Sequence, residues 1–515
     1  MRMGDKNRIP CNPQRLAQRT PSAGWNLNNN SDREIDLSSN NTASSEVVDT
    51  AGRNRLVINL LLVATFVVIL NETLMAVAIP RLMHDLNVTA GAVQWLTTAF
   101  LLTMSVVIPV TGFLLQRMNT RPIFVWAMSL FSLGTLIATL APNLQALVLA
   151  RVIQASGTAI MMPLLMTTAM TLAPPETRGK TMGFITTVIS VAPAIGPTIS
   201  GVILNYLSWR WMFLLVLPIS LGALALGARR ILNVTTPHTA AIDVISVVLS
   251  GFAFGGIVYG LSNIGAPGVP GTLPAGVWCA AGAVFLVVFL FRQVALQKSG
   301  YPLLDLRTFS SRNFTVSVLL MASMMMALFG TIILLPIYLQ NVLGLSTLQT
   351  GLLLLPGGLL MGLLGPKVGH LYDKWGPTRL LVPGVIVVSG VLWAMTLLGP
   401  ATPVGYILAG HVVMSIGFAL LFTPLFTVSL SSVKPSLYSH GSAVIGTLQQ
   451  AAGAAGVALF VALMSARAAT LAARGLSAKD ALSGGVSAGF LCGAIISIFA
   501  VACVFFVRRP APATG

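Results

Sequence analysis

The sequence predicts an all-α polytopic membrane protein with fourteen transmembrane helices and both chain ends on the same side of the bilayer. Three observations predict it. Of 515 residues, 55% are hydrophobic and only 8% are charged, whereas a soluble domain is about 25% charged. Fourteen stretches are apolar and long enough to cross a bilayer, which takes about 20 residues. Lysine and arginine also concentrate in every second loop between these stretches.

The expected helices are separated by short loops, apart from a polar N-terminal segment. They occupy residues 56–79, 91–115, 122–140, 145–172, 181–205, 210–228, 242–262, 275–292, 314–340, 347–368, 380–398, 404–430, 441–465 and 484–507. Residues 1–50 are rich in Asn, Ser, Arg and Asp and are expected to form a disordered tail. The four cysteines show neither metal-site spacing nor a disulfide framework.

Lysine and arginine concentrate in every second loop. The basic loops carry Arg53/Arg55, Arg117/Arg121, Arg178/Lys180, Arg229/Arg230, Arg292/Lys298/Arg307/Arg312, Lys374/Arg379, Lys434 and Arg508/Arg509. The intervening loops are nearly free of such residues, with Arg81, Arg210 and three bases in 467–479 as exceptions. Because basic loops stay cytoplasmic, both termini are expected in the cytoplasm of a cell-membrane protein. The net charge of +17 is thus a topology signal and not a sign of nucleic-acid binding.

Glu72 is the one acid well inside an expected span. It lies in "VVILNETLMAVAIP" (67–80), next to Asn71. A charge at mid-bilayer costs roughly 2.5–3.5 kcal/mol, so the side chain is either a protonated, hydrogen-bonded acid or a titrating proton carrier. Intramembrane acids commonly mark ion pathways, and this favours the second interpretation. Asp243, at the entrance of the seventh helix, is the next acid to consider.

A second intramembrane charge is Arg151, in "LVLARVIQASGTAIMMP". Gln154 and Gly157 follow it on about the same helix face. A guanidinium keeps its proton and needs an acceptor. Arg151 is either a snorkelling or capping residue near a helix end, or an electrostatic neighbour of Glu72 that tunes its protonation.

The fifth expected helix contains "APAIGPTISG", residues 192–201. Proline removes a backbone hydrogen bond and kinks a helix, and glycine lets a neighbouring helix approach closely. Pro193, Gly196, Pro197 and Gly201 therefore predict a bend at a moving interface.

Two loops carry copies of one pattern, at the same place in each half of the chain. The second copy, "GHLYDKWGPTR" (369–379), contains Gly369, Asp373, Lys374, Gly376 and Arg379. The first copy, "GFLLQRMNTR" (112–121), contains Gly112, Gln116, Arg117, Asn119 and Arg121. Such an internal repeat is typical of transporters built from related halves.

Together these motifs resemble the major facilitator superfamily, in its fourteen-helix drug:proton antiporter branch of multidrug- and lincomycin-resistance-type proteins. The resemblance covers about residues 55–507 and includes the loop motif, the fourth-helix "LARVIQASGTA" and the fifth-helix "APAIGPTISG". "WRWMF" at 209–213 and "LNETLMAVAIP" are similar to further motifs of the branch. The first loop copy departs from the pattern, with Gln116 and Asn119 for the usual aspartate and glycine. In the first helix Asn71 replaces the usual aspartate, and the acid is displaced to Glu72.

The resemblance implies two six-helix bundles that rock about a central cavity. The expected parts are the tail (1–50), an N-terminal bundle (51–232), two inserted helices (233–298), a C-terminal bundle (299–509) and a short end (510–515). Glu72, Arg151 and Asp243 are expected to couple protons. The loop residues Arg117, Arg121, Gly369, Asp373, Lys374, Gly376 and Arg379, with the fifth-helix residues, are expected to gate. The first copy is expected to rely less on a charge pair.

The expected activity is export of amphipathic drugs or toxic compounds in exchange for protons, without a cofactor. Candidate substrate contacts are polar, aromatic or methionine side chains in apolar surroundings: Asn71, Gln94, Trp95, Gln154, Met325, Tyr338, Gln340 and Gln449. Methionine adapts to varied apolar partners, although Met325 suits ordinary packing equally well. Alternatives are export of one metabolite, such as a siderophore, amino acid or lipid, and a membrane sensor that does not transport. An enzyme is not expected, because catalytic, metal and Walker motifs are missing from the sequence.

Overall fold

The computed structural model describes residues 35–233, 243–263, 273–298 and 302–509. The chain divides into two compact units, residues 1–52 and 53–515. In the first unit the described residues are helical and belong to the start of α1. The second unit holds the remaining helices and every contact discussed below.

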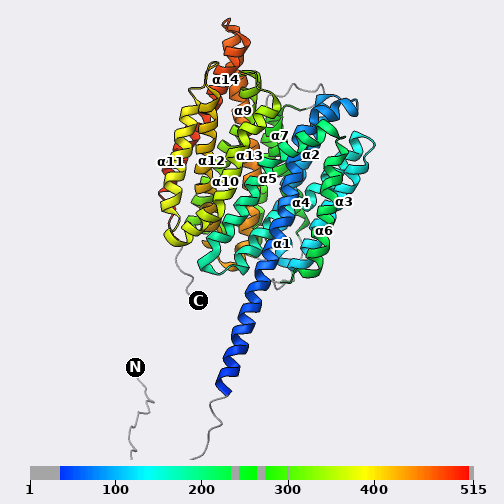
Figure 1. The fold of residues 1–515 in the computed structure, drawn as a ribbon, viewed down its shortest axis with the longest axis vertical. Helices are drawn as coiled ribbons and strands as arrows, with labels where there is room; N and C mark the ends of the chain where they lie inside the picture. The colour runs from blue at the N-terminus through cyan, green and yellow to red at the C-terminus, as the bar shows by residue number, and fades with distance from the viewer. Residues whose placement is uncertain (1–34, 234–242, 264–272, 299–301, 510–515) are drawn as a thin grey trace, which may run out of the picture. The chain divides into compact units, whose positions relative to one another are not determined.

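The described residues form fourteen α-helices and no strand, which confirms the predicted fold class. The α-helices are α1 (Ile35–Asp85), α2 (Ala90–Arg117), α3 (Thr120–Leu140), α4 (Leu144–Leu172), α5 (Arg178–Tyr206), α6 (Arg210–Arg230), α7 (Val244–Ser262), α8 (Ala275–Gln297), α9 (Arg312–Asn341), α10 (Thr347–Trp375), α11 (Thr378–Met395), α12 (Val404–Ser431), α13 (Tyr438–Ala473) and α14 (Ala478–Val504). Three short 3₁₀ turns are η1 (Pro175–Thr177), η2 (Leu306–Ser310) and η3 (Pro435–Leu437). Figure 1 shows the ribbon. Each α-helix contains a stretch long and apolar enough to span a bilayer.

The start of α1 corrects one expectation. The sequence predicted disorder through residue 50, but α1 begins at Ile35 and runs without a break into the apolar span. Extending an existing helix costs far less than nucleating a new one, because each added residue gains a hydrogen bond. A polar segment joined to a long apolar helix can therefore continue it. Residues 1–34 and 510–515 lie outside the described residues.

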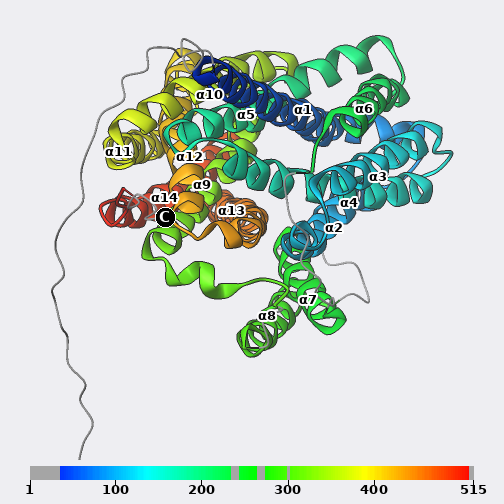
Figure 2. The same cartoon turned by 90° about the horizontal axis from the view of Figure 1, so that it is seen from below.

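The first six and last six helices repeat the same neighbour relations. Helix α4 packs against α2 and α3, and α6 packs against α3; correspondingly, α12 packs against α10 and α11, and α14 packs against α11. The inserted helices α7 and α8 pack against each other, and α7 also contacts α2 and α13. Figure 2 shows α7 beside α2, and α8 beside α7, at one edge of the bundle. The repeat predicted from the two loops thus extends to the packing of whole helices.

The most extensive contacts between the first six helices and the last six are those of α5 with α10 and of α2 with α13, and smaller contacts join α4 with α13 and α5 with α12. In the first pair glycines let the backbones meet. A Cβ added at Gly183 would collide with the carbonyl oxygen of Gly365, and one added at Gly369 would collide with that of Gly179. Small residues are the usual means by which membrane helices approach closely. The same pairs end at the loop motifs, and we call this end of the bundle the motif end.

Candidate functional site

Glu72 lies on α1 where this helix packs against the proline-containing part of α5. Its side chain is partly exposed, and the neighbouring Asn71 is buried with its Nδ2 unpartnered among the described residues. On α5, Gly196 lies directly against Thr73. One turn further, the Ser200 hydroxyl donates a hydrogen bond to the Leu74 carbonyl oxygen at 2.9 Å. The fifth-helix motif therefore forms the close contact with the helix that carries the acid.

Arg151 is 2% exposed and is held by Gln154 of its own helix and by side chains of α2 and α3. Its Nη1 donates to Oε1 of Gln154 at 2.9 Å, and Nε2 of Gln154 donates to the Thr135 hydroxyl on α3 at 2.8 Å. On its other side the guanidinium carbon lies 4.0 Å from the ring centroid of Phe100 on α2, a cation–π contact. Its Nε has no partner among the described residues. Gln154 is thus a positioning residue for Arg151.

Glu72 and Arg151 interact electrostatically. Within the described ranges the carboxylate has no ion pair closer than 4.0 Å and no hydrogen bond. A tight buried pair would hold the carboxylate ionised, because removing one partner of such a pair leaves an uncompensated charge. At a longer separation the acid is free to exchange a proton, and the exchange changes the net charge of the two groups. Of the two interpretations that the sequence left open for Arg151, this interaction agrees with an electrostatic neighbour of Glu72, about 80 residues away in the chain.

Asp243 lies in a different environment, at the N-cap of α7. It forms a bidentate ion pair with Arg292 of α8, with Oδ2 2.7 Å from Nε and Oδ1 2.8 Å from Nη2, and it accepts a hydrogen bond from Ser246. These contacts hold the pKa of Asp243 at about 2. Its carboxylate stays ionised near neutral pH and ties the two inserted helices together. The structure brings Asp243 to Arg292 rather than to Glu72 or Arg151.

The second loop motif ties α10 to the start of α5. Asp373 accepts hydrogen bonds from the backbone N–H groups of Gly179 (2.7 Å) and Lys180 (2.9 Å). These N–H groups belong to the first turn of α5, where a helix has unpaired donors and a partial positive charge. The carboxylate therefore caps a helix of the other half of the chain.

The first loop motif makes a weaker version of this contact. Gln116 donates from Nε2 to the carbonyl oxygen of Ser436 in η3, directly before α13, at 3.0 Å. A neutral amide supplies no charge to the start of α13. The two copies differ as their sequences do, with a charged cap on α5 and a single neutral hydrogen bond beside α13.

The other expected gating residues divide into structural and exposed positions. Gly376 has φ 80°, a conformation that favours glycine, and it ends α10. Helix α5 runs unbroken through Pro193 and Pro197. Gly201 is exposed, and a Cβ there would meet nothing within 4 Å. The basic side chains of the two loops are exposed: Arg117, Arg121, Lys374 and Arg379.

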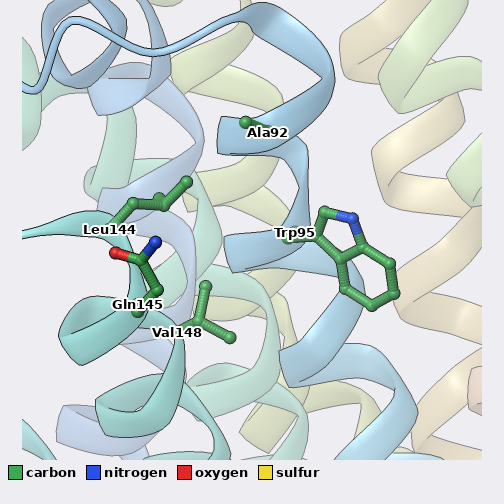
Figure 3. A pocket seen from close by; sticks show the side chains of 5 residues that line it. All are labelled: Ala92, Trp95, Leu144, Gln145 and Val148. Carbon is green, nitrogen blue, oxygen red and sulfur yellow. The ribbon is translucent and has the colours of Figure 1, made fainter.

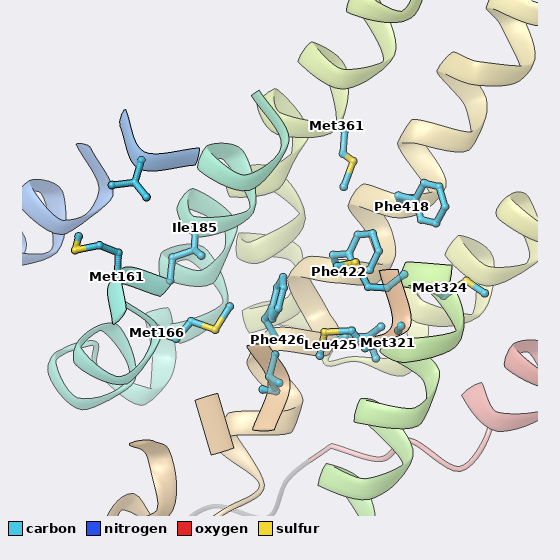
Figure 4. Packing of buried hydrophobic residues seen from close by; sticks show 14 of the residues in the cluster. Met161, Met166, Ile185, Met321, Met324, Met361, Phe418, Phe422, Leu425 and Phe426 are labelled. Atoms are coloured by element: carbon cyan, nitrogen blue, oxygen red, sulfur yellow. The ribbon is translucent and has the colours of Figure 1, made fainter. Parts of the chain in front are cut away.

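Three of the expected substrate contacts take part in packing or positioning. Gln154 holds Arg151, and the buried Tyr338 donates its hydroxyl hydrogen to the Gly399 carbonyl oxygen at 2.6 Å. Met325 is 3% exposed. Figure 4 shows its neighbours in sequence, Met321 and Met324, within the buried apolar cluster. The packing interpretation therefore fits Met325. Gln340 and Gln449 are half-buried, and Gln94 is exposed.

Trp95 borders a hollow between α2 and α4, at the end opposite the motif end. Figure 3 shows Ala92 and Trp95 of α2 on one side and Leu144, Gln145 and Val148 of α4 on the other. Its volume of about 280 Å³ is slightly below the usual range of ligand pockets, roughly 300–1,000 Å³. Trp95 also lies near Tyr259 of α7, with ring centroids 6.0 Å apart. The hollow is therefore a peripheral feature between helices.

Sequence reasoning missed several residues that join the two halves, and it missed His411. The cross-half hydrogen bonds are made by hydroxyls whose types are common throughout the chain: Thr167 with Ser442 (2.8 Å), Thr423 to Thr186 (2.9 Å) and Thr187 to the Gly362 carbonyl oxygen (2.7 Å). No sequence pattern singles them out. His411 had a usable signal, because it is an ionisable residue inside an apolar stretch, as Glu72 is.

The profile of the Major Facilitator Superfamily matches residues 61–457. The chain belongs to this superfamily. It is therefore a multi-pass membrane transporter of small molecules, and its predicted family and fold are confirmed. It is 38% identical over 453 residues to the lincomycin resistance protein LmrB of Listeria monocytogenes, and the aligned region covers 87% of this chain and 95% of LmrB. It is 37% identical over 454 residues to the MFS-type transporter YcnB of Bacillus subtilis, with 88% and 95% covered.

Among solved structures, the superfamily's proton:xylose symporter XylE is similar to this chain with a TM-score of 0.63. The likeness covers 89% of this chain and 97% of that one at 14% sequence identity. At this identity the comparison shows a shared fold and does not extend to substrate.

Proposed function

We propose that this transporter exports amphipathic, often cationic compounds from the cell in exchange for protons. The names of its lincomycin-resistance relatives support the class of substrate. The observation that carries the coupling is the arrangement of Glu72, a partly exposed intramembrane acid within electrostatic range of the buried Arg151. Protonation from outside neutralises Glu72 and releases a cationic substrate, and deprotonation inside restores the charge that attracts the next one.

The proposed cycle is alternating access between two bundles, residues 51–232 and 299–509, with 233–298 as an inserted pair. The motif end is assigned to the cytoplasm, with both termini on that side, because the basic loops lie there. The contacts of α5 with α10 and of α2 with α13 then close the cytoplasmic side in this structure. Opening this side requires Asp373 to leave the start of α5 and the glycine-lined helix contacts to separate.

The test uses Glu72→Gln in proteoliposomes with an imposed pH gradient, with ethidium and lincomycin as probes. Glutamine has nearly the size of the protonated acid and makes similar hydrogen bonds, so we expect a folded protein. Uphill transport and substrate-induced proton release are expected to be lost, while exchange down a substrate gradient persists. Glu176→Gln, the same change at an exposed residue of η1, is the matched control.

If Glu72→Gln still drives uphill transport that a protonophore abolishes, the proton site lies elsewhere. If the wild-type protein moves neither probe but exchanges a single metabolite from a panel for protons, the coupling stands and the substrate class is wrong.

A further inference from the structure

We propose that His411 on α12 is a second proton-binding site, placed in the last six helices where Arg151 is placed in the first six. The site itself stands on geometry, and its role in transport rests on the proposed proton-driven cycle. The first half would then hold a permanent positive charge at this position, and the second half a charge that a proton switches on.

The helix registers make the two positions equivalent. Arg151 is the eighth residue of α4, and His411 is the eighth residue of α12. Six residues further on, Gly157 packs against α3 and Gly417 packs against α11, the matching helices of the repeat. Both side chains therefore lie at the same position along their helices, and these helices have matching neighbours in the two halves.

The facing helices are also in register, and they explain why the two sites differ. The Phe100 ring that contacts Arg151 is the eleventh residue of α2, and Gly357 is the eleventh residue of α10. A Cβ added at Gly357 would lie 2.5 Å from Cδ2 and 2.6 Å from Nε2 of His411. Glycine therefore makes the room that the imidazole occupies. The first half pairs a guanidinium with an aromatic ring, and the second pairs an imidazole with a bare backbone.

The hydrogen bonds of His411 leave one ring nitrogen as a free base. Nε2 lies 3.1 Å from the carbonyl oxygen of Leu354 on α10. A carbonyl oxygen can only accept, so Nε2 carries the hydrogen. Nδ1 is buried and has no partner among the described residues. The Ser415 hydroxyl donates to the backbone carbonyl of His411 at 2.8 Å and not to the ring. Nδ1 therefore holds an unused lone pair inside the membrane span.

No charged side chain in the described part of the chain competes for this nitrogen. Among the described residues of α5, α9, α10, α11 and α13, no ionisable side chain interacts electrostatically with His411. The hydroxyls of Tyr406 on α12 and Tyr338 on α9 are engaged elsewhere: Tyr406 donates to the Ala394 carbonyl oxygen and Tyr338 to that of Gly399. A proton on Nδ1 would create a donor without an acceptor here. Burying such a donor is costly, so protonation favours conformations in which Nδ1 reaches water.

The first experiment measures protonation directly. The full-length protein, labelled with ¹⁵N-histidine, is placed in nanodiscs, and His411 is assigned by the signal missing from His411→Gln. We expect this signal to change reversibly as the pH is varied over the range in which the protein stays folded, and the midpoint of the change to move when ethidium is added. A His411 signal that stays constant over this range overturns the proposal, whether or not the protein transports any probe.

The second experiment measures coupling. In His411→Gln the amide nitrogen can still donate to the Leu354 carbonyl, but the side chain cannot take a proton. We expect the slope of log efflux rate against pH to fall by about one, while His84→Gln, the same change at an exposed residue of α1, keeps the wild-type slope. His411→Asn serves if the glutamine variant does not fold. An unchanged slope overturns the role of His411, whereas failure of the proposed function appears separately, in Glu72→Gln.

Discussion

Asp373→Asn is expected to weaken closure of the motif end, and its magnitude follows from two hydrogen bonds. The carboxylate accepts from the N–H groups of Gly179 at 2.7 Å and Lys180 at 2.9 Å. A hydrogen bond to a charged group contributes about 1.5–3 kcal/mol, and a neutral one about 1 kcal/mol. Asparagine keeps one acceptor oxygen, loses the charge and turns an N–H₂ donor toward the other backbone N–H. Because the site is half-exposed, we take about 2 kcal/mol as the loss.

In the proposed cycle this loss acts on the closed conformation alone, because opening of the motif end would separate Asp373 from the start of α5. At about 1.4 kcal/mol for each factor of ten, the ratio of closed to open molecules should fall roughly 30-fold. Transport should slow even though the protein reaches the membrane normally, because one half of the cycle loses its stable state.

The assay is a distance measurement between spin labels on α5 and α10. Phe184 and Lys367 are exposed residues of these helices, and each is replaced by cysteine in a chain whose native cysteines are removed. The short-distance population should shrink in Asp373→Asn and remain in Glu176→Gln, which neutralises an acid of η1 that caps no helix. Equal populations in wild type and Asp373→Asn would show that the loop is only a turn.

Two further changes test the helix contacts and the inserted pair. Gly183→Val should prevent close packing of α5 on α10, at a cost of about 1–3 kcal/mol for overpacking, and stop efflux. Gly201→Val on the same helix meets open space and should leave efflux intact; equal loss in both variants contradicts the packing argument. Asp243→Asn should leave the pH profile of efflux unchanged between about pH 5 and 8, because Arg292 keeps the pKa of Asp243 at about 2. Above pH 3.8, the ordinary pKa of the carboxyl, the melting temperature of the wild-type protein in detergent should exceed that of Asp243→Asn. This difference should vanish as the pH falls through about 2, where the carboxylate of the folded protein becomes protonated. A shifted pH profile of efflux in Asp243→Asn would instead place Asp243 in the proton path.

Sequence alone was enough to predict the fourteen spans and the repeat. Spanning a bilayer depends on apolar length, a property of consecutive residues, so α2 to α14 lie close to their predicted ranges. The upstream start of α1 was missed because composition measures the tendency of a segment to fold alone, whereas Ile35–Asp85 extends a helix that already exists. Asp373 stood out as an acid in a loop motif, but nothing in that loop indicated that its partner is the start of α5.

The chemistry of individual charges was decided by the tertiary structure. Glu72 and Asp243 are both acids of apolar helices. Asp243 forms an ion pair with Arg292, whereas Glu72 interacts with Arg151 electrostatically without forming an ion pair. The sequence determined which ionisable residues lie in the membrane, since that depends on local hydropathy. Helix packing decided which of them is paired, free or exposed. A charge interacts strongly only with groups a few ångströms away, and in this chain those groups come from helices far apart in sequence.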